Sequence, residues 1–338
     1  MECISIFDML KIGVGPSSSH TLGPWRAAER WINHLKKVHL FNEITSIKVD
    51  LYGSLSLTGK GHATDLAILL GLSGADPEYI PTEEIPYLIS KIKEEKIIIF
   101  GNSYSVNFNP LTDIKFNKEF LPFHSNAIKF TGFNNNNEIS TDTYYSIGGG
   151  FVVREELIHA KENIEIHKTF PFPIQKAKEL EFFCKETKLK ISEIVLENER
   201  SLRTDNQIDF EIKRIWDTML ECMYIGCHTE GTLPGGLSVR RRAFDMHQKL
   251  KENRVYNTPN EWLNSIRNTE VKFRQILKWV SCFALSVNEV NASLGRVVTA
   301  PTNGSAGVIP AVLMYYMVIE NHEAKFEHIK QFLLVASE

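Results

Sequence analysis

The stretch Phe170-Pro171-Phe172-Pro173 divides the sequence into two parts with different hydrophobic patterns. Before it, short alternating segments are mixed with helical ones. After it, the apolar residues follow the helical period of about 3.6 residues almost throughout. Two prolines within four residues suit neither a helix interior nor a central strand, so this stretch is typical of a linker. The pattern predicts an α+β N-terminal domain, 1–165, a linker, 166–174, and an all-α domain, 175–338.

The first part carries both helix and strand signals. A helix is predicted from Pro24 to about Lys37, because proline suits a first helical turn and Trp25 and Trp31 fall on one face. A second helix is predicted from His62 to about Leu72. Alternating or β-branched runs predict strands at 47–52, 97–100, 104–108, 127–132 and 138–146, with a hairpin turn at Asn134–Asn137. The segments 13–23 and 53–60 are predicted to be loops.

The second part reads as helices almost throughout. Helical periodicity is found at 175–187, 191–202, 208–226, 238–252, 259–266, 270–293 and 305–321. The longest apolar run, Val308–Ile319, contains Pro310 and is about a dozen residues long, whereas a membrane-spanning helix needs roughly 20. We therefore expect a buried helix there and no membrane partner.

The composition is that of a folded chain of about two domains. Of 338 residues, 43% are hydrophobic and 23% charged, and the net charge is −3, which does not favour nucleic acid as a partner. The N-terminus lacks the features of a secretory signal. Five cysteines, odd in number and without a regular pattern, argue against a disulfide scaffold. We expect a cytoplasmic protein with reduced thiols.

The run GPSSSHT, 15–21, is the first chemical motif. Ser17, Ser18, Ser19 and His20 precede a predicted helix, where free backbone amides and hydroxyls attract an anion such as a substrate carboxylate. The alternative is an ordinary helix cap, which one serine would satisfy. Three serines with a histidine exceed that requirement, so a binding site is favoured.

The run GKGHATD, 59–65, follows a predicted strand and begins a predicted helix. A first-turn position favours the neutral form of the His62 imidazole, which is the form that a general base needs. Asp65, three residues on, would share a helical face with His62 and orient its ring. The alternative, a histidine satisfied by a local hydrogen bond, has similar weight on spacing alone.

Weaker motifs follow. Thr302 and Asn303 begin a small, polar, glycine-rich run before a helix, and the nearby Arg296 could pair with a carboxylate. A glycine-rich turn between helices is the alternative. Asn126, which follows His124 by two residues, would be interpreted as an ordinary β-turn residue if its motif stood alone. Cys222, Cys227 and His228 match neither zinc nor redox spacing, so the two cysteines are interpreted as core or semi-buried thiols.

Taken together, several runs resemble one family, the iron–sulfur L-serine dehydratases in their single-chain bacterial form. The matching runs cover nearly the whole sequence in order: SIFDMLKIGVGPSSSHTLGP, VDLYGSLSLTGKGHATD, LPFHSNAIKF, TYYSIGGGFVV, TEGTLPGGLSVRRRA and GRVVTAPTNGSAGVIPAV. A collinear set of this kind is far more specific than any single motif.

The resemblance implies an L-serine ammonia-lyase that forms pyruvate and ammonia by way of aminoacrylate. It implies a 4Fe-4S cluster that acts as a Lewis acid on the serine hydroxyl, a protein base for the Cα proton, and a homodimer. The motifs and the resemblance together predict the site residues: as catalytic groups, His62 and His20; as substrate-binding groups, Ser17, Ser18, Ser19, Asn126, Thr302 and Asn303; and as supporting groups, Asp65 and Arg296.

The family's three cluster cysteines lie downstream of the TNG motif, in GCQ-type and TCDP…PC runs. The sequence up to Glu338 contains neither run, and none of its five cysteines matches those positions. We therefore expect a truncated helical domain, without metal ligands of its own, that is inactive alone. The alternative is an amino-acid-binding regulatory fragment that performs no catalysis. A pyridoxal-phosphate enzyme is disfavoured by the helical second part.

Overall fold

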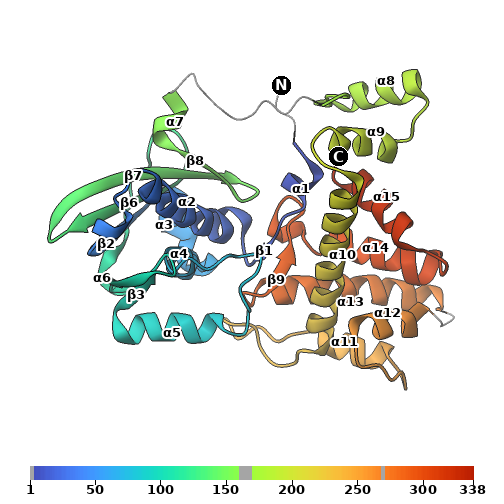
Figure 1. Cartoon of the computed structure of the whole chain (residues 1–338). Helices are drawn as coiled ribbons and strands as arrows, with labels where there is room; N and C mark the ends of the chain where they lie inside the picture. The colour runs from blue at the N-terminus through green and yellow to red at the C-terminus, as the bar shows by residue number, and fades with distance from the viewer. Residues whose placement is uncertain (1–3, 160–169, 268–270) are drawn as a thin grey trace. The chain divides into compact units, whose positions relative to one another are not determined.

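The computed structural model describes residues 4–159, 170–267 and 271–338 (Figure 1). The chain forms two compact units. One consists of Gly13–Asn163, and the other of Met1–Ile12 with Ile164–Glu338. The first unit is mixed α/β and the second is helical, which confirms the predicted fold class. Of the predicted linker, 166–174, the first four residues lie outside the described residues.

The α/β unit is built on a seven-stranded sheet. Its strand order is β3-β4-β2-β6-β7-β8, and β5 pairs with β2. The central strand β2 runs antiparallel to β6 and parallel to β5. The predicted strands are confirmed, and β5 and β8 are added to them. The bounds are β2 Ser46–Tyr52, β3 Ile97–Phe100, β4 Tyr104–Asn107, β5 Ile114–Phe116, β6 Asn126–Asn134, β7 Asn137–Gly148 and β8 Phe151–Arg154.

The helix α2 (Gly23–Lys37) covers the sheet with its apolar face. The indole of Trp31 stacks on Phe130 of β6, with ring centroids 5.2 Å apart, and its Nε1 donates to the buried carboxylate of Asp142 at 3.0 Å. The helix α4 (Thr64–Leu72) packs closely on α2, because a Cβ at Gly71 would lie 2.7 Å from the carbonyl oxygen of Trp25. Trp25 and Trp31, which predicted this helix, thus also lie at its contacts with α4 and with the sheet.

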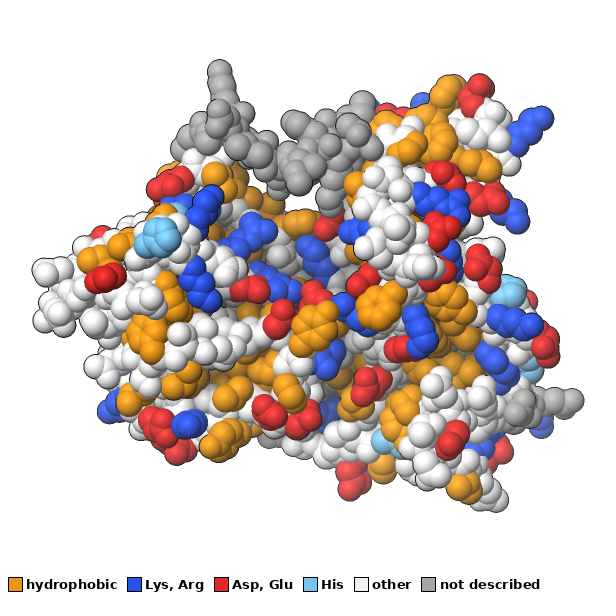
Figure 2. Space-filling model, viewed as in Figure 1, with side chains coloured by type: hydrophobic (Ala, Val, Ile, Leu, Met, Phe, Trp, Pro, Cys, Tyr) orange, Lys and Arg blue, Asp and Glu red, His pale blue; other side chains and the backbone are white. Residues whose placement is uncertain are grey.

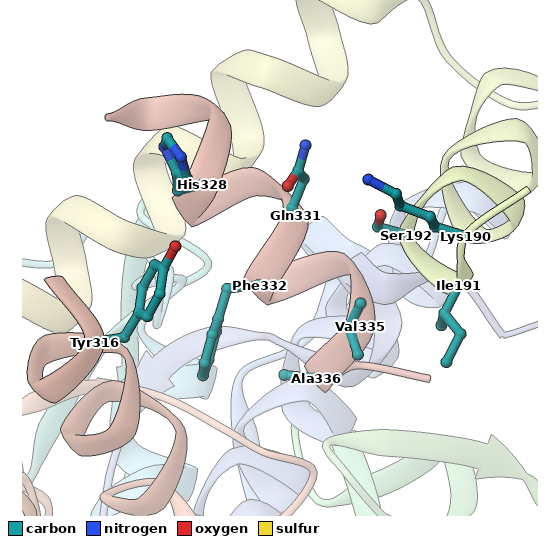
Figure 3. Close-up of a pocket in the computed structure, with 9 residues that line it drawn as sticks. All are labelled: Lys190, Ile191, Ser192, Tyr316, His328, Gln331, Phe332, Val335 and Ala336. Atoms are coloured by element: carbon teal, nitrogen blue, oxygen red, sulfur yellow. The ribbon is translucent and has the colours of Figure 1, made fainter. Parts of the chain in front are cut away.

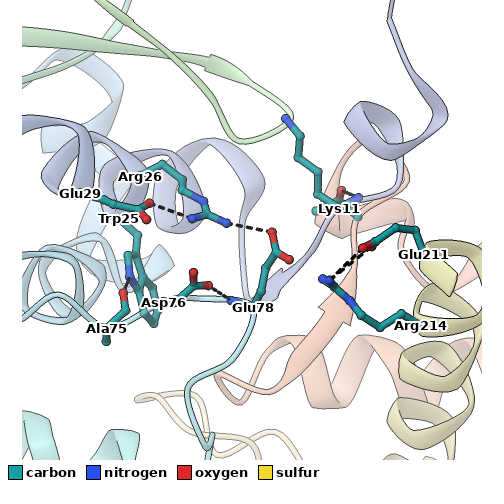
Figure 4. A network of polar contacts seen from close by, with 10 residues as sticks. Lys11, Trp25, Arg26, Glu29, Ala75, Asp76, Glu78, Glu211 and Arg214 are labelled. Atoms are coloured by element: carbon teal, nitrogen blue, oxygen red, sulfur yellow. Dashed lines mark hydrogen bonds and ion pairs between the residues drawn. The ribbon is translucent and has the colours of Figure 1, made fainter. Parts of the chain in front are cut away.

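Polar contacts fix α2 to the segment that follows α4 (Figure 4). The guanidinium of Arg26 bridges Glu29, at 2.8 Å, and Glu78, at 3.0 Å. The indole Nε1 of Trp25 donates to the carbonyl of Ala75 at 2.7 Å. These contacts hold α2 in place, and the chain immediately before α2 carries the first candidate motif.

Both segments predicted as loops contain helical turns. The π-helix η1 (Ser18–Leu22) continues directly into α2, and at its start the hydroxyl of Ser17 accepts from the His20 amide as a cap. The segment 53–60 forms α3 (Gly53–Thr58) and the start of the 3₁₀ turn η3 (Gly59–His62). The helix α4 begins at Thr64 and not at His62, since Ala63 has a left-handed backbone, φ 54°, that a right-handed helix cannot contain.

The remaining elements of the α/β unit are short or peripheral. The helix α5 buries one face through Ile85, Ile89 and Ile92. These residues have helical spacing in the sequence, but this helix was not predicted. The bounds are α5 Ile85–Glu95, η2 Phe41–Glu43, α6 Pro110–Asp113 and α7 Glu155–His159; the short strand β1, Ile12–Val14, leads into this unit.

In the helical unit, α10 and α13 form the centre of the core. A Cβ at Gly226 of α10 would lie 2.3 Å from the carbonyl oxygen of Ser286 of α13, so the two backbones touch at this point. Every predicted helix is present, although the last one ends in the π-helix η5. The bounds are α8 Ala177–Thr187, α9 Ile191–Arg200, α10 Asp205–His228, α11 Ala243–Leu250, α12 Pro259–Arg267, α13 Phe273–Asn291, β9 Arg296–Val298, η4 Asn303–Ser305, α14 Val308–Tyr315, η5 Tyr316–Glu320 and α15 Phe326–Ala336.

The first residues of the chain belong to this helical unit. The short helix α1 (Ile6–Met9) is tied to α9 by the buried carboxylate of Glu199, which accepts from the hydroxyl of Ser5 and the amide of Ile6. The backbones of Lys11 and Thr299 are also hydrogen bonded. No helix in the described part of the chain combines the length and hydropathy that a membrane span requires.

Candidate active site

His20 is held at both ring nitrogens by serine hydroxyls. Ser19 Oγ lies 2.8 Å from His20 Nδ1, and Ser54 Oγ, from the first turn of α3, lies 2.9 Å from His20 Nε2. Burial, and then the neighbouring His62, lower the pKa of His20. The imidazole of His20 is therefore neutral at pH 7 and fixed in orientation.

His62 is held at one nitrogen and open at the other. Its Nδ1 lies 3.0 Å from the carbonyl oxygen of Thr58. A carbonyl only accepts hydrogen bonds, so Nδ1 carries the proton and Nε2 of the neutral ring carries a lone pair. Within the described residues Nε2 has no hydrogen-bond partner, and the rings of His62 and His20 are 4.9 Å apart. Asp65, which was expected to orient the His62 ring, lies in the first turn of α4. The Nδ1 atom of His62 is instead held by the carbonyl of Thr58.

Asn126 joins the same site through Ser146. Its Nδ2 donates to the carbonyl of Ser146 at 3.2 Å, and Ser146 Oγ donates to the carbonyl of Ser19 at 2.8 Å. Its Oδ1 is buried and has no partner among the described residues. A buried amide oxygen without a donor is costly, so this atom is available to a ligand that donates hydrogen bonds. The backbone N–H of Asn126 donates to His124 Nδ1 at 3.1 Å.

The start of η1 leaves two amides open. Ser17 is fully used as a cap, because its hydroxyl accepts from the His20 amide and its carbonyl from the amides of Thr21 and Leu22. Within the described residues, the amides of Ser18 and Ser19 have no hydrogen-bond acceptor. Open amides at a helix start favour a carboxylate.

The third motif lies in the helical unit. Asn303, only 2% exposed, donates from Nδ2 to Asn291 Oδ1 at 2.8 Å, and its own Oδ1 is buried without a partner among the described residues. Thr302 Oγ1 is 2.9 Å from Ser305 Oγ. Arg296 is the first residue of β9. The side-chain amide of Asn303 thus resembles that of Asn126: its nitrogen donates a hydrogen bond, and its oxygen is available to a ligand.

Two residues of the α/β site were not singled out from the sequence. Ser54 and Ser146 both lie inside the runs that carried the family resemblance, VDLYGSLSLTGKGHATD and TYYSIGGGFVV. Their roles depend on contacts with the 17–20 segment, 34 residues away for Ser54 and 127 for Ser146. No local pattern could have shown these pairings.

The cysteines do not form a metal site in the described part of the chain. No group of three or more His, Cys, Asp or Glu residues there is placed to hold a metal ion. Cys222, Cys227 and Cys282 are buried, which confirms the interpretation of the first two as core or semi-buried thiols. The sulfurs of Cys227 and Cys282 are 3.7 Å apart, but a cluster needs further thiolates. The described residues therefore do not fit an iron–sulfur cluster.

A pocket in the helical unit lies apart from these motifs in the sequence. Figure 3 shows it beside α9 and α15, with an aromatic wall of Tyr316 and Phe332 and with Lys190 and His328 among its polar groups. None of the residues singled out from the sequence lines it. On the face drawn in Figure 2, acidic and basic side chains are interspersed, a distribution unlike the basic patch of a nucleic-acid-binding face.

Comparison with known proteins identifies both units. Residues 5–157 match the family described as serine dehydratase beta chain, and residues 186–338 match serine dehydratase alpha chain. "L-serine dehydratase 2" of Escherichia coli K12 is 37% identical over 335 residues, which cover 99% of this chain and 70% of that protein. The chain belongs to the serine dehydratase family.

Two further relatives support the assignment. "L-serine dehydratase 1" of Escherichia coli K12 is 40% identical over 315 residues, which cover 93% of this chain and 66% of that protein. The "L-serine dehydratase" of Helicobacter pylori is 34% identical over 333 residues, which cover 98% of this chain and 68% of that protein. The chain spans about two thirds of the length of these family members.

Proposed function

We propose that the chain acts in the deamination of L-serine to pyruvate and ammonia. Loss of the Cα proton and the β-hydroxyl gives aminoacrylate and water; aminoacrylate then tautomerises to an imine, which water hydrolyses. The family membership and the names of the relatives support this reaction. The single observation that carries it is the contact of His62 Nδ1 with the carbonyl oxygen of Thr58 at 3.0 Å, from which we infer that Nε2 carries the lone pair.

His62 is the proposed general base. With Nδ1 donating to Thr58, the lone pair of Nε2 can take the Cα proton of serine. His20 is the second proposed catalytic group. Because its pKa is lowered by burial, it stays neutral and does not place a positive charge beside His62 before the proton is transferred. The two histidines thus have different roles although they are neighbours.

The proposed substrate contacts match the two ends of an amino acid. The amides of Ser18 and Ser19 suit the carboxylate, with Ser17 holding the segment in shape. The oxygen of Asn126 suits the ammonium group, which can only donate. From the family resemblance we also propose Thr302 and Asn303 as substrate-binding residues; the oxygen of Asn303 suits a donor for the same reason.

The supporting and physiological assignments rest on the sequence and the resemblance. They are Asp65 and Arg296 as supporting residues, a homodimer and a cytoplasmic location. An iron–sulfur cluster is also implied by the family, but the described residues do not fit one, so no step is derived through it. Light scattering after size-exclusion chromatography tests the dimer, which a monomer mass would overturn.

The test measures binding and turnover separately. Calorimetric titration of the 338-residue chain with L-serine, with D-serine as control, measures binding. A pyruvate assay after anaerobic incubation with iron and sulfide measures turnover. The His62→Gln variant should lower pyruvate formation by about 100-fold or more while L-serine affinity changes little. Activity unaffected by His62→Gln would overturn the base assignment.

The second candidate is an amino-acid-binding module without catalysis. The buried and unsatisfied oxygen of Asn126 favours it, because this atom needs a ligand but no reaction. Saturable L-serine binding that is unchanged in the His62→Gln variant, with no pyruvate under any of the assay conditions, is the result expected of this alternative.

A further inference from the structure

Two threonines cross-link the segments that carry the two histidines. Thr21 Oγ1 donates to the carbonyl oxygen of His62 at 2.7 Å, and Thr64 Oγ1 donates to the carbonyl oxygen of His20 at 2.5 Å. Each threonine lies one or two residues after one histidine and bonds to the other. Both threonines are fully buried, with no exposed surface. This reciprocal pair of hydrogen bonds is called the threonine clasp below.

We propose that Thr21 and Thr64 are positioning residues that set the separation and orientation of His20 and His62. The inference rests on the proposed function of this histidine pair. The clasp joins positions 41 and 44 residues apart, and both of its acceptors are backbone atoms of the histidines themselves. Loss of either hydrogen bond would therefore let the two histidine backbones move relative to each other, and their rings with them.

The local backbone is irregular where the clasp forms. The α-helical donor to the carbonyl of His20 would be the amide of residue 24, but Pro24 has no N–H, and His20 lies in the π-helix η1. Thr64 supplies a donor to that carbonyl. On the other side, His62 is followed by Ala63 in the left-handed conformation, so its segment turns sharply before α4. Thr21 holds the carbonyl at that turn.

The clasp acts on the chemistry through the distance between the rings. With ring centroids 4.9 Å apart, a charge on one histidine disfavours a charge on the other, and His62 is one of the groups that lower the pKa of His20. Ser54 and Ser19 hold the ring of His20, and in the described part of the chain neither is hydrogen bonded to His62. The two rings are also linked through α3, which carries both Ser54 and Thr58, and the clasp adds two direct hydrogen bonds between the backbones of the histidine segments.

The test removes each hydroxyl with little change in volume. Thr21→Val and Thr64→Val in the full chain should raise the pKa of His20 toward its ordinary value and mix the tautomers of His62. Both are measured by NMR of ¹⁵N-labelled histidine side chains, assigned with His20→Gln and His62→Gln. Thr21→Ser and Thr64→Ser keep the hydroxyl and should restore the wild-type spectra. In an active preparation, the valine variants should lower kcat about 10- to 100-fold with a smaller change in KM.

Thr45→Val is the control for loss of a threonine hydroxyl, at an exposed position. Thr45 also donates from its hydroxyl to a backbone carbonyl of this unit, that of Phe133, but contacts neither histidine. Thr45→Val should leave the pKa of His20 and the tautomer of His62 unchanged. Thr21→Ala and Thr64→Ala repeat the test if a valine variant does not fold. Unchanged histidine titrations and tautomers in folded variants that lack the hydroxyls would overturn the proposal.

The NMR measurement needs neither substrate nor turnover, so its outcome is separate from that of the proposed function. Altered histidine spectra in a chain that binds no L-serine would support the clasp and overturn the proposed function. Unaltered spectra in a chain that binds and deaminates L-serine would do the reverse.

Discussion

The indole Nε1 of Trp262 donates a hydrogen bond of 3.0 Å to Nε2 of His247, and both side chains are fully buried. The acceptor nitrogen must be unprotonated. Burial, and then the neighbouring His228, lower the pKa of His247 to about 3. The core of the helical unit therefore depends on a neutral histidine.

This pair makes stability depend on pH. The folded-state pKa of His247 lies below its ordinary value of 6.5, so the unfolded chain binds the proton more readily. The stabilisation is present above about pH 6.5 and is lost as the pH falls toward 3, by at most about 1.4 kcal/mol per pH unit for one such group. Urea unfolding at pH 7.5, 6 and 5 measures it. His247→Gln should reduce the dependence, whereas His322→Gln, at an exposed position, should not; equal slopes for both would contradict the assignment.

The buried thiols should be protected from alkylation. Burial raises the pKa of Cys222, and burial together with the neighbouring Cys282 raises that of Cys227, so neither forms the reactive thiolate at pH 8. Mass mapping after iodoacetamide treatment should find Cys184, which is partly exposed, labelled in the native chain. Cys222, Cys227 and Cys282 should react only after denaturation. Rapid native labelling of Cys222 would show that the helical core is open.

The contact of α10 with α13 should not tolerate a side chain at position 226. An added Cβ would lie 2.3 Å from the backbone oxygen of Ser286, which cannot rotate away. Gly226→Ala should lower the free energy of unfolding by about 1–3 kcal/mol, although alanine favours helix by about 1 kcal/mol. Gly236→Ala is the control, because nothing lies within 4 Å of its added Cβ. A neutral Gly226→Ala would mean that the two helices are further apart.

Glu199 should be essential for attaching α1 to the helical unit. Its carboxylate is 1% exposed and accepts from Ser5, Ile6 and Arg203. Glu199→Leu leaves these donors without an acceptor and should cost about 3–5 kcal/mol of unfolding free energy, measured in urea. Glu197→Leu removes an exposed carboxylate from the same helix and should change it by about 0.5 kcal/mol or less. Similar losses in the two variants would reject the role of Glu199.

The secondary structure was largely predictable because it follows from local periodicity. Trp25 and Trp31 predicted the inner face of α2, and the alternation in 47–52 predicted β2. Errors arose where the local signal was misleading. The small and polar residues of 53–60 suggest a loop, but α3 forms there, and the start of α4 is set by the backbone of Ala63. Periodicity in one stretch cannot reveal either effect.

The candidate site divides in the same way. The sequence by itself determined the family, the fold class and the residue types of the site, because His20, His62, Ser17–Ser19 and Asn126 lie in short, dense runs. Only the tertiary structure decided which nitrogen of His62 is open, that Ser54 and Ser146 belong to the site, and that Thr21 and Thr64 connect its two segments. The physical reason is that a hydrogen bond fixes a tautomer or a ring only through its partner, and these partners are brought into reach by folding.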